Sequence, residues 1–217
     1  MTVLTKDPHA PTALREPRRV LRDHLADALV ALELPEVQSA CTVADLGAGA
    51  GVPGLPLAVA RPEATVFLVE SNRRKCAFIA RAAEATGVLN VVVVPERAEA
   101  WRDGLGRLDL VTARALAPVS VVAEYAAPLL RLGGALVAWR GRIDAREERE
   151  ARTVAAELGL RYGQPRRVEP YPGAAHRHLQ LMVKTEPTPP RFPRRPGMAR
   201  KRPLGAGSPP ASDRRRR

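Results

Sequence analysis

The chain has 217 residues, enough for one domain with extensions. Its hydrophobic fraction of 45% supports a core, and because aromatic residues make up only 4%, Leu, Val and Ala must fill it. Two cysteines provide no disulfide framework, no signal peptide opens the chain, and no apolar run approaches the roughly 20 residues that span a bilayer. These features exclude a disulfide-rich secreted domain and a helical membrane protein, and they predict a soluble, cytoplasmic protein.

The positive charge is concentrated at the carboxyl end. The formal net charge is +12 and the isoelectric point about 11.0, which is typical of a protein that binds a polyanion. Residues 187–217 contain ten Lys and Arg against one acidic residue, a net +9 of that total. We expect this region to bind nucleic acid; the alternative is a solvated tail in an arginine-rich composition.

The first half of the chain alternates helix and strand patterns. Apolar residues at helical spacing predict a helix over residues 16–34, which the following proline ends. A short strand then ends at Asp45, and three glycines follow it at every second position. Pro53 suits the first turn of the next helix, because its missing N–H has no intrahelical partner there. The second strand covers residues 65–69 and ends at Glu70.

The second half continues the alternation. Ser71 or Asn72 can cap a helix that ends at Gly87. Val91–Val94 is apolar throughout, as expected of a parallel strand that is covered on both faces. The other elements predicted before residue 160 are strands over 108–112 and 135–139 and helices over 120–130 and 144–158.

Two late strands are predicted around residues 160–168 and 178–184. The loop between them is too short for a crossover helix, so they should pair antiparallel as a hairpin. Strands that alternate with helices predict an α/β protein with a mostly parallel, Rossmann-like sheet. Seven strands with a late antiparallel hairpin are the architecture of class I S-adenosylmethionine-dependent methyltransferases. The predicted organisation is a helical extension (1–40), a methyltransferase domain (41–186) and a basic Pro/Arg-rich tail (187–217).

The glycine-rich stretch admits two interpretations. Residues 49–54 satisfy G-x-G-x-x-G, and Glu70 lies about 20 residues further on, as in dinucleotide-binding proteins. The alternative ligand is S-adenosylmethionine, which has no phosphate and carries an ammonium and a sulfonium beside a carboxylate. Glycine lets such a ligand approach the backbone closely. The methyltransferase interpretation uses more of the residues, namely Asp45, Gly47, Gly49 and Gly51.

Acidic residues at strand ends are the candidate ligands of that cofactor. Asp45 is placed to accept the ammonium, directly or through water, and Glu70 to accept both ribose hydroxyls with its two oxygens. The alternative for Glu70 is a surface carboxylate at a strand end. The Ala98 N–H and the Glu99 side chain are expected to meet adenine N1 and N6, unless Glu99 only starts a helical turn. No metal site is expected.

Five patches between residues 12 and 205 form a recognisable set. They are TALREP at 12–17 followed by His24 and Asp27, DLGAGAGVPGLPL at 45–57, ARA at 113–115, RHL at 177–179, and the basic stretch from Arg191 to Leu204. The chain thereby resembles the RsmG (GidB) family, the guanine-N7 methyltransferases of bacterial small-subunit ribosomal RNA. The family's motifs are T-x-[IL]-R-[DE]-P…H-x-x-D, a cofactor loop extended by P-G-[IL]-P-L, S-R-A, R-H-L and Y-P-R-[KR]-x-G…P-L.

The resemblance implies methyl transfer from S-adenosylmethionine to N7 of a guanine in the 530-loop region of 16S ribosomal RNA, at position 527. Its partner would be the 30S subunit or an assembly intermediate, and the enzyme a monomer. Guanine N7 carries a free lone pair, so the reaction needs no base. The bases of RNA must first be unstacked into the site.

The resemblance also assigns residues. Leu55 joins the cofactor-binding loop, and Arg114 serves both the cofactor and catalysis, gripping the target's phosphate or O6 while leaving N7 open. The alternative for Arg114 is an ion pair with Asp109 or Glu124. The residues expected to contact RNA are Arg97, Arg140, Arg191, Arg194, Arg195, Lys201 and Arg202. His24 is expected either to stack on or hydrogen-bond RNA or to be satisfied in the core, and Trp139 to pack.

Four departures from the family pattern stand out. Only eleven residues precede Thr12, where the family has a longer helical region, so either this start is late or the chain is a shortened paralogue. Arg140-Gly141 replaces Lys-Gly, which keeps the charge but changes the donor geometry. Ala113 replaces a serine, and residues 205–217, with four terminal arginines, extend past the resemblance.

Three other functions compete with the RNA methyltransferase. The same fold and cofactor could serve a small-molecule acceptor, which the basic tail disfavours. A catalytically inactive RNA-binding paralogue would bind RNA without turnover. A nicotinamide-dependent oxidoreductase would bind NAD(H) and not S-adenosylmethionine.

Overall fold

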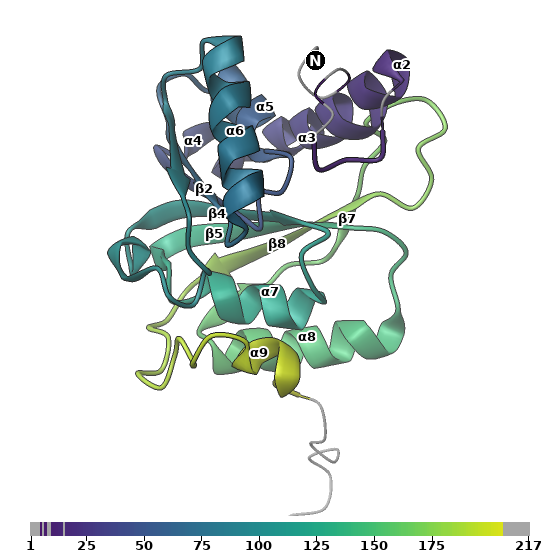
Figure 1. Ribbon diagram of the computed structural model, residues 1–217. Helices are drawn as coiled ribbons and strands as arrows, with labels where there is room; N and C mark the ends of the chain where they lie inside the picture. Colours follow the sequence, from purple (N-terminus) through teal and green to yellow (C-terminus); the bar gives the residue numbers. More distant parts are fainter. Residues whose placement is uncertain (1–4, 6, 8–9, 15, 206–217) are drawn as a thin grey trace, which may run out of the picture.

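The computed structural model describes residues 5, 7, 10–14 and 16–205. Arg15 of the TALREP patch and the four terminal arginines lie outside these residues. The chain forms a central sheet between two layers of helices (Figure 1). No helix in the described ranges is long and apolar enough to cross a bilayer.

Within residues 16–205 the sheet has eight strands in the order β3-β2-β1-β4-β5-β8-β6, with β7 also paired to β8. The first five strands of the chain pair in parallel, and β8 runs antiparallel to its neighbours. This confirms the predicted α/β sheet with late antiparallel strands. The strands are β1 Thr42–Leu46, β2 Thr65–Val69, β3 Val91–Val94, β4 Leu108–Arg114, β5 Leu130–Arg140, β6 Leu160–Tyr162, β7 Arg166–Arg167 and β8 His178–Lys184.

One layer holds the helices from the amino-terminal half of the chain, and the other holds α7, α8 and α9 (Figure 1). The first layer comprises α2 Pro17–Val20, α3 Asp27–Leu29, α4 Pro35–Ser39, α5 Gly54–Ala60 and α6 Arg73–Thr86. The second layer comprises α7 Val119–Ala126, α8 Ala145–Glu157 and α9 Met198–Lys201, and a short 3-10 helix covers Arg102–Gly104.

The capping residues predicted from the sequence delimit the long helices. The Asn72 side chain accepts the N–H groups of Arg74 and Lys75 at the start of α6, and Gly87 ends that helix with φ +67°. Asp144 caps α8 in the same way. Side chains at helical spacing on α6, including Phe78 and Ile79, are fully buried against the sheet. These helices therefore follow from local sequence signals.

Several predicted elements were wrong in extent. The helix predicted over 16–34 changes its hydrogen-bond pattern twice, through a π-helical stretch at Leu21–Ala26 and a 3-10 turn at Val30–Glu33. Leu21, one of the apolar residues in this stretch, is 52% exposed. The helix predicted over 120–130 is shorter, because β5 already begins at Leu130. The strand predicted over 160–168 is divided into β6 and β7.

The expectation that Val91–Val94 is covered on both faces was also wrong. This strand lies at the edge of the sheet and has β2 as its partner, and Val92 is 45% exposed. An apolar run indicates a strand in a parallel sheet, but its lateral position is set by the order of the strands. That order depends on the crossovers and is not encoded in the run itself.

The order of the strands positions the site. β1 lies between β2 and β4, so the connections from β1 and from β4 diverge to opposite sides of the sheet at this point. Ligands of open α/β sheets bind at such a switch point, beyond the carboxyl ends of the strands. Leu46 pairs with Ala113, which brings the loop after β1 beside the loop after β4.

Candidate functional site

The loop after β1 is held in a tight return over the strand end. Gly47 and Gly51 have φ of +66° and +78°, a region that side chains rarely adopt. A Cβ on Gly47 would lie 2.5 Å from Leu116 Cδ1, and a Cβ on Gly51 would lie 2.6 Å from Leu55 Cδ1. Leu55 therefore packs beneath the loop and supports its shape, and it lines neither of the two cavities described below.

Asp45 closes this loop from the inside. Its side chain is buried, with Oδ2 accepting the Gly54 N–H at 2.9 Å and Oδ1 accepting the Thr112 hydroxyl at 3.2 Å. This placement does not fit the expected direct contact with an ammonium group, because both carboxylate oxygens face the protein interior. The structure instead gives Asp45 the role of fixing the loop to the start of α5.

The buried carboxyl of Asp45 makes stability depend on pH. Burial raises the pKa of Asp45 to about 7, above the usual value of about 3.9 in an unfolded chain. The stabilisation is therefore complete below about pH 4 and is lost as the pH rises through about 7, by an amount on the order of 4 kcal/mol. The Asp45→Asn variant keeps the side-chain shape and should lack this dependence.

Denaturant unfolding of both proteins between pH 5 and pH 8 measures this difference. The free energy of unfolding of the wild type should fall with pH relative to that of Asp45→Asn. Parallel profiles for the two proteins would show that Asp45 does not titrate in this range. Asp45→Ala, which removes both acceptors, should be destabilised at every pH.

Glu70 stands at the end of β2, as the sequence predicts. Its Oε1 accepts the Asn72 N–H at 2.8 Å and its Oε2 accepts the Gly49 N–H at 3.1 Å, so it ties the glycine loop to the start of α6. Only 7% of Glu70 is exposed, and it lines a cavity. Each carboxylate oxygen has a second lone pair available for a ligand.

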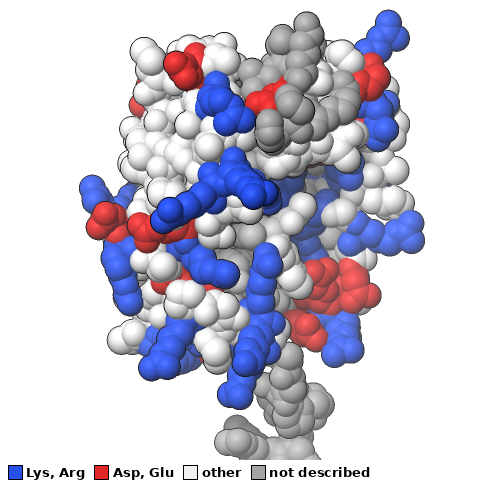
Figure 2. Space-filling model, viewed as in Figure 1, with Lys and Arg blue, Asp and Glu red and all other residues white. Residues whose placement is uncertain are grey.

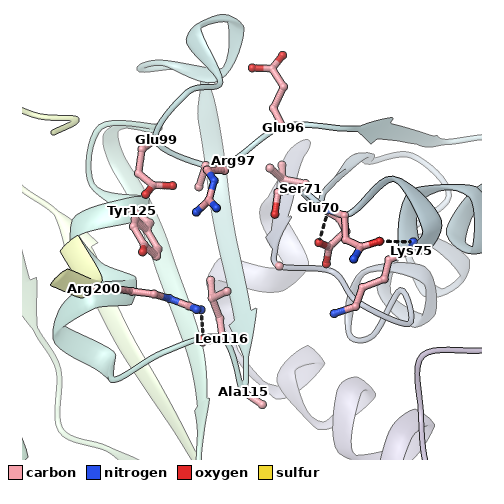
Figure 3. Close-up of a pocket in the computed structure, with 14 residues that line it drawn as sticks. Glu70, Ser71, Lys75, Glu96, Arg97, Glu99, Ala115, Leu116, Tyr125 and Arg200 are labelled. Carbon is pink, nitrogen blue, oxygen red and sulfur yellow. Dashed lines mark hydrogen bonds between the residues drawn. The ribbon is translucent and has the colours of Figure 1, made fainter. Parts of the chain in front are cut away.

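The first cavity has a volume of about 370 Å³ and lies over the ends of β1, β2 and β4. Figure 3 shows Glu70 and Lys75 on one side of it and Glu99, Tyr125 and Arg200 on the other. Its lining is Gly47, Val69, Glu70, Ser71, Asn72, Lys75, Glu96, Arg97, Ala98, Glu99, Ala115, Leu116, Tyr125 and Arg200.

The predicted adenine-binding pair also lines this cavity. In the described part of the chain, the Ala98 N–H has no hydrogen-bond partner, so it is available to an acceptor on a ligand. Glu99 is buried, and its Oε1 accepts the Gly197 N–H at 2.9 Å. Glu99 thus has a second function that the sequence did not indicate, since it anchors a segment nearly 100 residues further along the chain.

A second cavity of about 630 Å³ adjoins the first, and both are lined by Gly47, Lys75 and Ala115. Ala115 has φ +54°, a strained conformation for a residue with a side chain. The other lining residues are Pro11, Thr12, Leu14, Arg19, Asp23, His24, Asp27, Ala48, Gly49, Ala50, Val52, Arg114, Trp139, Arg140, Gly141 and Arg177. The structure thereby brings the distant motifs TALREP, H-x-x-D, ARA and RHL to one place.

Arg114 lines the second cavity and forms hydrogen bonds with three other residues. Its NH1 group donates to Asp27 Oδ2 at 2.9 Å and to the Asp23 carbonyl at 3.0 Å, and its NH2 group contacts His24 Nδ1 at 2.9 Å. The ion pair is therefore with Asp27, and neither Asp109 nor Glu124 is the partner. Three N–H groups are used within the described residues, which leaves the Nε–H and one NH2 hydrogen for a ligand.

His24 is held as the neutral imidazole by its neighbours. The Arg114 guanidinium can only donate, so His24 Nδ1 accepts and Nε2 carries the proton toward Thr12 Oγ1 at 2.9 Å. Burial, together with the adjacent Arg114 charge, lowers the pKa of His24. Trp139 packs as expected, and its indole N–H donates to the Asp27 carbonyl at 2.7 Å. Two roles were expected for His24, contact with RNA or hydrogen bonding within the protein. These contacts match the second role.

The candidates for RNA contact divide into paired and exposed groups. Arg140 was expected to be available, but its side chain is 6% exposed and bound by Glu147 and Glu148. Arg194 is likewise committed to Glu124, through two bonds of 2.6 Å. Arg191 pairs with Glu157 at the surface. The exposed members are Arg97, Arg195, Lys201 and Arg202.

The cavity residues without a role assigned from the sequence include Arg177, Lys75, Tyr125 and Arg200. Arg177 belongs to the RHL patch, and its Nε lies 3.4 Å from Asp27 Oδ1. Lys75 lines both cavities. It follows the Asn72 cap by three residues, so its place in the first turn of α6 could have indicated a position near the site. Tyr125 and Arg200 carry no signal, because only the folded chain brings them to the first cavity. Among the described residues, no cluster of His, Cys, Asp or Glu could hold a metal ion.

Comparison with known sequences identifies the family of the chain. The family model described as GidB, rRNA small subunit methyltransferase G, matches residues 7–168. The chain belongs to the GidB (RsmG) family. Relatives named ribosomal RNA small subunit methyltransferase G include one from Rubrobacter xylanophilus, 40% identical over 89% of this chain and 76% of its own length. A second, from Deinococcus deserti, is 40% identical over 89% of this chain and 80% of its own length.

Solved structures agree on the fold of this GidB chain. A SAM-dependent methyltransferase from Aquifex aeolicus has a TM-score of 0.59 and 17% identity, covering 78% of this chain and 94% of that one. A SAM-dependent O-methyltransferase from Thermotoga maritima has a TM-score of 0.57 and 15% identity, covering 82% and 69%. The predicted class I methyltransferase fold is therefore confirmed, and the chain is an S-adenosylmethionine-dependent methyltransferase by family.

Proposed function

We propose that this chain transfers the methyl group of S-adenosylmethionine to N7 of a guanine in the 530-loop region of 16S ribosomal RNA. The observation that carries the proposal is the junction of two cavities at Gly47 and Ala115, at the switch point of the sheet. One cavity suits a nucleoside and the other is open and partly cationic. Methyl transfer requires that donor and acceptor meet at such a junction.

The first cavity fits the cofactor by its donors and acceptors. Glu70 offers carboxylate lone pairs to ribose hydroxyls, and the Ala98 N–H offers a free donor to adenine. Lys75 supplies positive charge that suits the cofactor's carboxylate. The volume of about 370 Å³ is within the range of about 300–1,000 Å³ that is usual for small-molecule sites.

The second cavity fits the acceptor base. Arg19, Arg114 and Arg177 give its wall a positive charge, which attracts the RNA backbone. We propose that the two unused N–H groups of Arg114 hold a phosphate or the guanine O6 and leave N7 facing the junction. The arrangement is a positioning device, because alignment of the reactants alone lowers such barriers by several kcal/mol.

The cofactor, when bound, supplies an electrophilic methyl group on its sulfonium. Transfer would form the N7–methyl bond as the sulfur–methyl bond breaks and would leave S-adenosylhomocysteine. Because guanine N7 has its own lone pair, no side chain would have to remove a proton first. The residues then have two tasks: the glycine loop and Glu70 fix the donor, and Arg114 with the N-terminal helices fixes the acceptor. The Nδ1 lone pair of His24 already accepts from Arg114 and its Nε2 carries the proton, so these contacts agree with a positioning role and not with that of a base.

The decisive experiment measures methyl transfer from labelled S-adenosylmethionine to 30S subunits that lack N7 methylation, followed by mapping of 7-methylguanosine. Label in one guanine of the 530 loop is expected. Label that appears only in small molecules, and not in the RNA, would favour another acceptor. Binding of RNA without any incorporation of label would favour an inactive paralogue. Binding of NAD(H) in place of S-adenosylmethionine would refute the cofactor. Comparing free 16S RNA, assembly intermediates and complete 30S subunits would identify the partner.

We also propose that the enzyme acts as a cytoplasmic monomer. Residues of a single chain form both cavities. Light scattering at assay concentrations tests this, with a single species of about 23.5 kDa expected.

A further inference from the structure

Residues 187–205, here called the C-terminal arm, are packed onto the second helical layer. Phe192 and Ala199 are buried in the core beside α7. Arg194 binds Glu124 on α7 through both carboxylate oxygens at 2.6 Å, and Glu124 is only 3% exposed. A bidentate pair of this kind fixes both distance and orientation. The arm is therefore a fixed element of the fold as far as residue 205.

The inner side of the arm reaches the first cavity at two points. Glu99, which lines the cavity, accepts the Gly197 N–H at 2.9 Å and so holds the start of α9. One turn later, the Arg200 guanidinium donates to the Leu116 carbonyl at 2.5 Å. Figure 3 shows Arg200 extending toward Leu116 beneath Tyr125. The arm thus contributes Arg200 to the lining of the first cavity and is tied to a second lining residue, Glu99.

Leu116 connects the arm to the junction of the two cavities. It follows Ala115, whose φ is strained, and its Cδ1 lies 2.5 Å from the place that a Cβ on Gly47 would take. The Leu116 carbonyl is held by Arg200, so the arm fixes the loop after β4 against the glycine loop. Strained backbone persists only when its surroundings hold it in place.

The outer side of the arm presents a different surface. Arg195, Lys201 and Arg202 are exposed there and do not line the first cavity. Figure 2 shows Lys and Arg side chains gathered over the lower half of this face, where Figure 1 places α7, α8 and α9. Arg200 is exposed as well, and it differs from these basic neighbours in also lining the first cavity.

We propose that Arg200 is a positioning residue of the cofactor site, and that the C-terminal arm is a shared wall with the cofactor on its inner side and RNA on its outer side. This inference rests on the proposed function, because it takes the first cavity as the S-adenosylmethionine site. Arg200 acts by holding Leu116 and the junction loop. The exposed Lys201 and Arg202 serve RNA only.

The test compares Arg200→Ala with Lys201→Ala, a matched change one residue away. Calorimetric titration with S-adenosylhomocysteine should give a dissociation constant about tenfold higher for Arg200→Ala and unchanged for Lys201→Ala. Filter binding of a 16S RNA fragment at low salt should show the reverse pattern. Arg200→Lys should recover part of the cofactor affinity, since it keeps one donor for the Leu116 carbonyl.

A second measurement follows the protection of the C-terminal arm from trypsin, which does not depend on cofactor affinity alone. Saturating S-adenosylhomocysteine should slow tryptic cleavage of the Lys201–Arg202 bond in the wild type, as followed by mass spectrometry. In Arg200→Ala this protection should be lost. Equal cofactor affinity and equal protection in the two proteins would overturn the role of Arg200. A wild type that fails to bind S-adenosylhomocysteine would overturn the proposed function itself, so the two failures are distinguishable.

Discussion

Arg114→Ala is expected to reduce methyl transfer by at least about 100-fold while leaving cofactor affinity nearly unchanged, since loss of a desolvated charged contact costs about 2–5 kcal/mol. The physical reason is its position: Arg114 lines the second cavity and keeps two N–H groups free for the acceptor. It does not line the first cavity. Single-turnover methyl transfer to 30S subunits and titration with S-adenosylhomocysteine measure the two effects separately.

This experiment needs a control for structure, because Arg114 also binds Asp27, which is almost fully buried. Removing one partner of such a pair destabilises a protein by roughly 3–5 kcal/mol. Asp27→Asn weakens the same pair but retains Arg114, and it should keep methyl transfer within about tenfold of wild type. If Asp27→Asn loses as much turnover as a folded Arg114→Ala, Arg114 serves only to dock the N-terminal helices. Near-normal turnover of Arg114→Ala would remove its role altogether.

The parts of the site that could be predicted are those fixed by local sequence. A strand, alternating glycines and a proline place the loop after β1, and a second strand of the same pattern ends at Glu70. Because β1 and β2 pair in parallel and in register, their carboxyl ends lie together, and Glu70 meets the Gly49 N–H. No knowledge of distant contacts was needed for this inference.

Asp45 shows where local inference fails. Its position at the end of β1 was predicted, but the direction of its side chain depends on what lies behind the strand. Thr112 on β4 and Gly54 at the start of α5 both turn the carboxylate inward. Only the order of the strands and the return of the loop determine this, so the sequence could equally indicate an exposed ligand.

Basic residues were the least predictable part. Arg140 and Arg194 looked equivalent to Lys201 and Arg202 in the sequence, yet each of the first two is held by a carboxylate. Glu124 is 70 residues from Arg194, and no periodicity links them. Charge composition predicts that a chain binds a polyanion, but ion pairing within the fold decides which cations are free to do so.

The motifs of the N-terminal region illustrate the opposite case. Their spacing alone gave no reason for His24 and Asp27 to meet Arg114, which lies about 90 residues away, and only the family resemblance grouped them. The structure supplies the physical reason, since Asp27 is buried between Arg114 and Arg177. The N-terminal helices are therefore part of the wall of the second cavity, which is the proposed acceptor site.

Glu70→Ala is expected to weaken binding of S-adenosylhomocysteine by at least about 100-fold, since each charge-assisted hydrogen bond contributes about 1.5–3 kcal/mol and two ribose hydroxyls lose their acceptor. The variant also releases the Gly49 and Asn72 N–H groups, which loosens the glycine loop. Loss of affinity alone therefore does not separate a ribose contact from a structural effect on the loop.

Ligands that differ only in the ribose make that separation. The wild type should bind S-adenosylhomocysteine about tenfold or more tightly than its 2′-deoxy analogue, because the analogue leaves one Glu70 lone pair without a donor. In Glu70→Gln, which keeps the size of the side chain but loses one acceptor oxygen and the charge, this preference should shrink toward unity. A preference that persists undiminished in Glu70→Gln would refute the ribose contact and leave Glu70 as a support of the loop. A preference lost together with the carboxylate would identify the end of β2 as the point where this fold recognises a ribonucleoside.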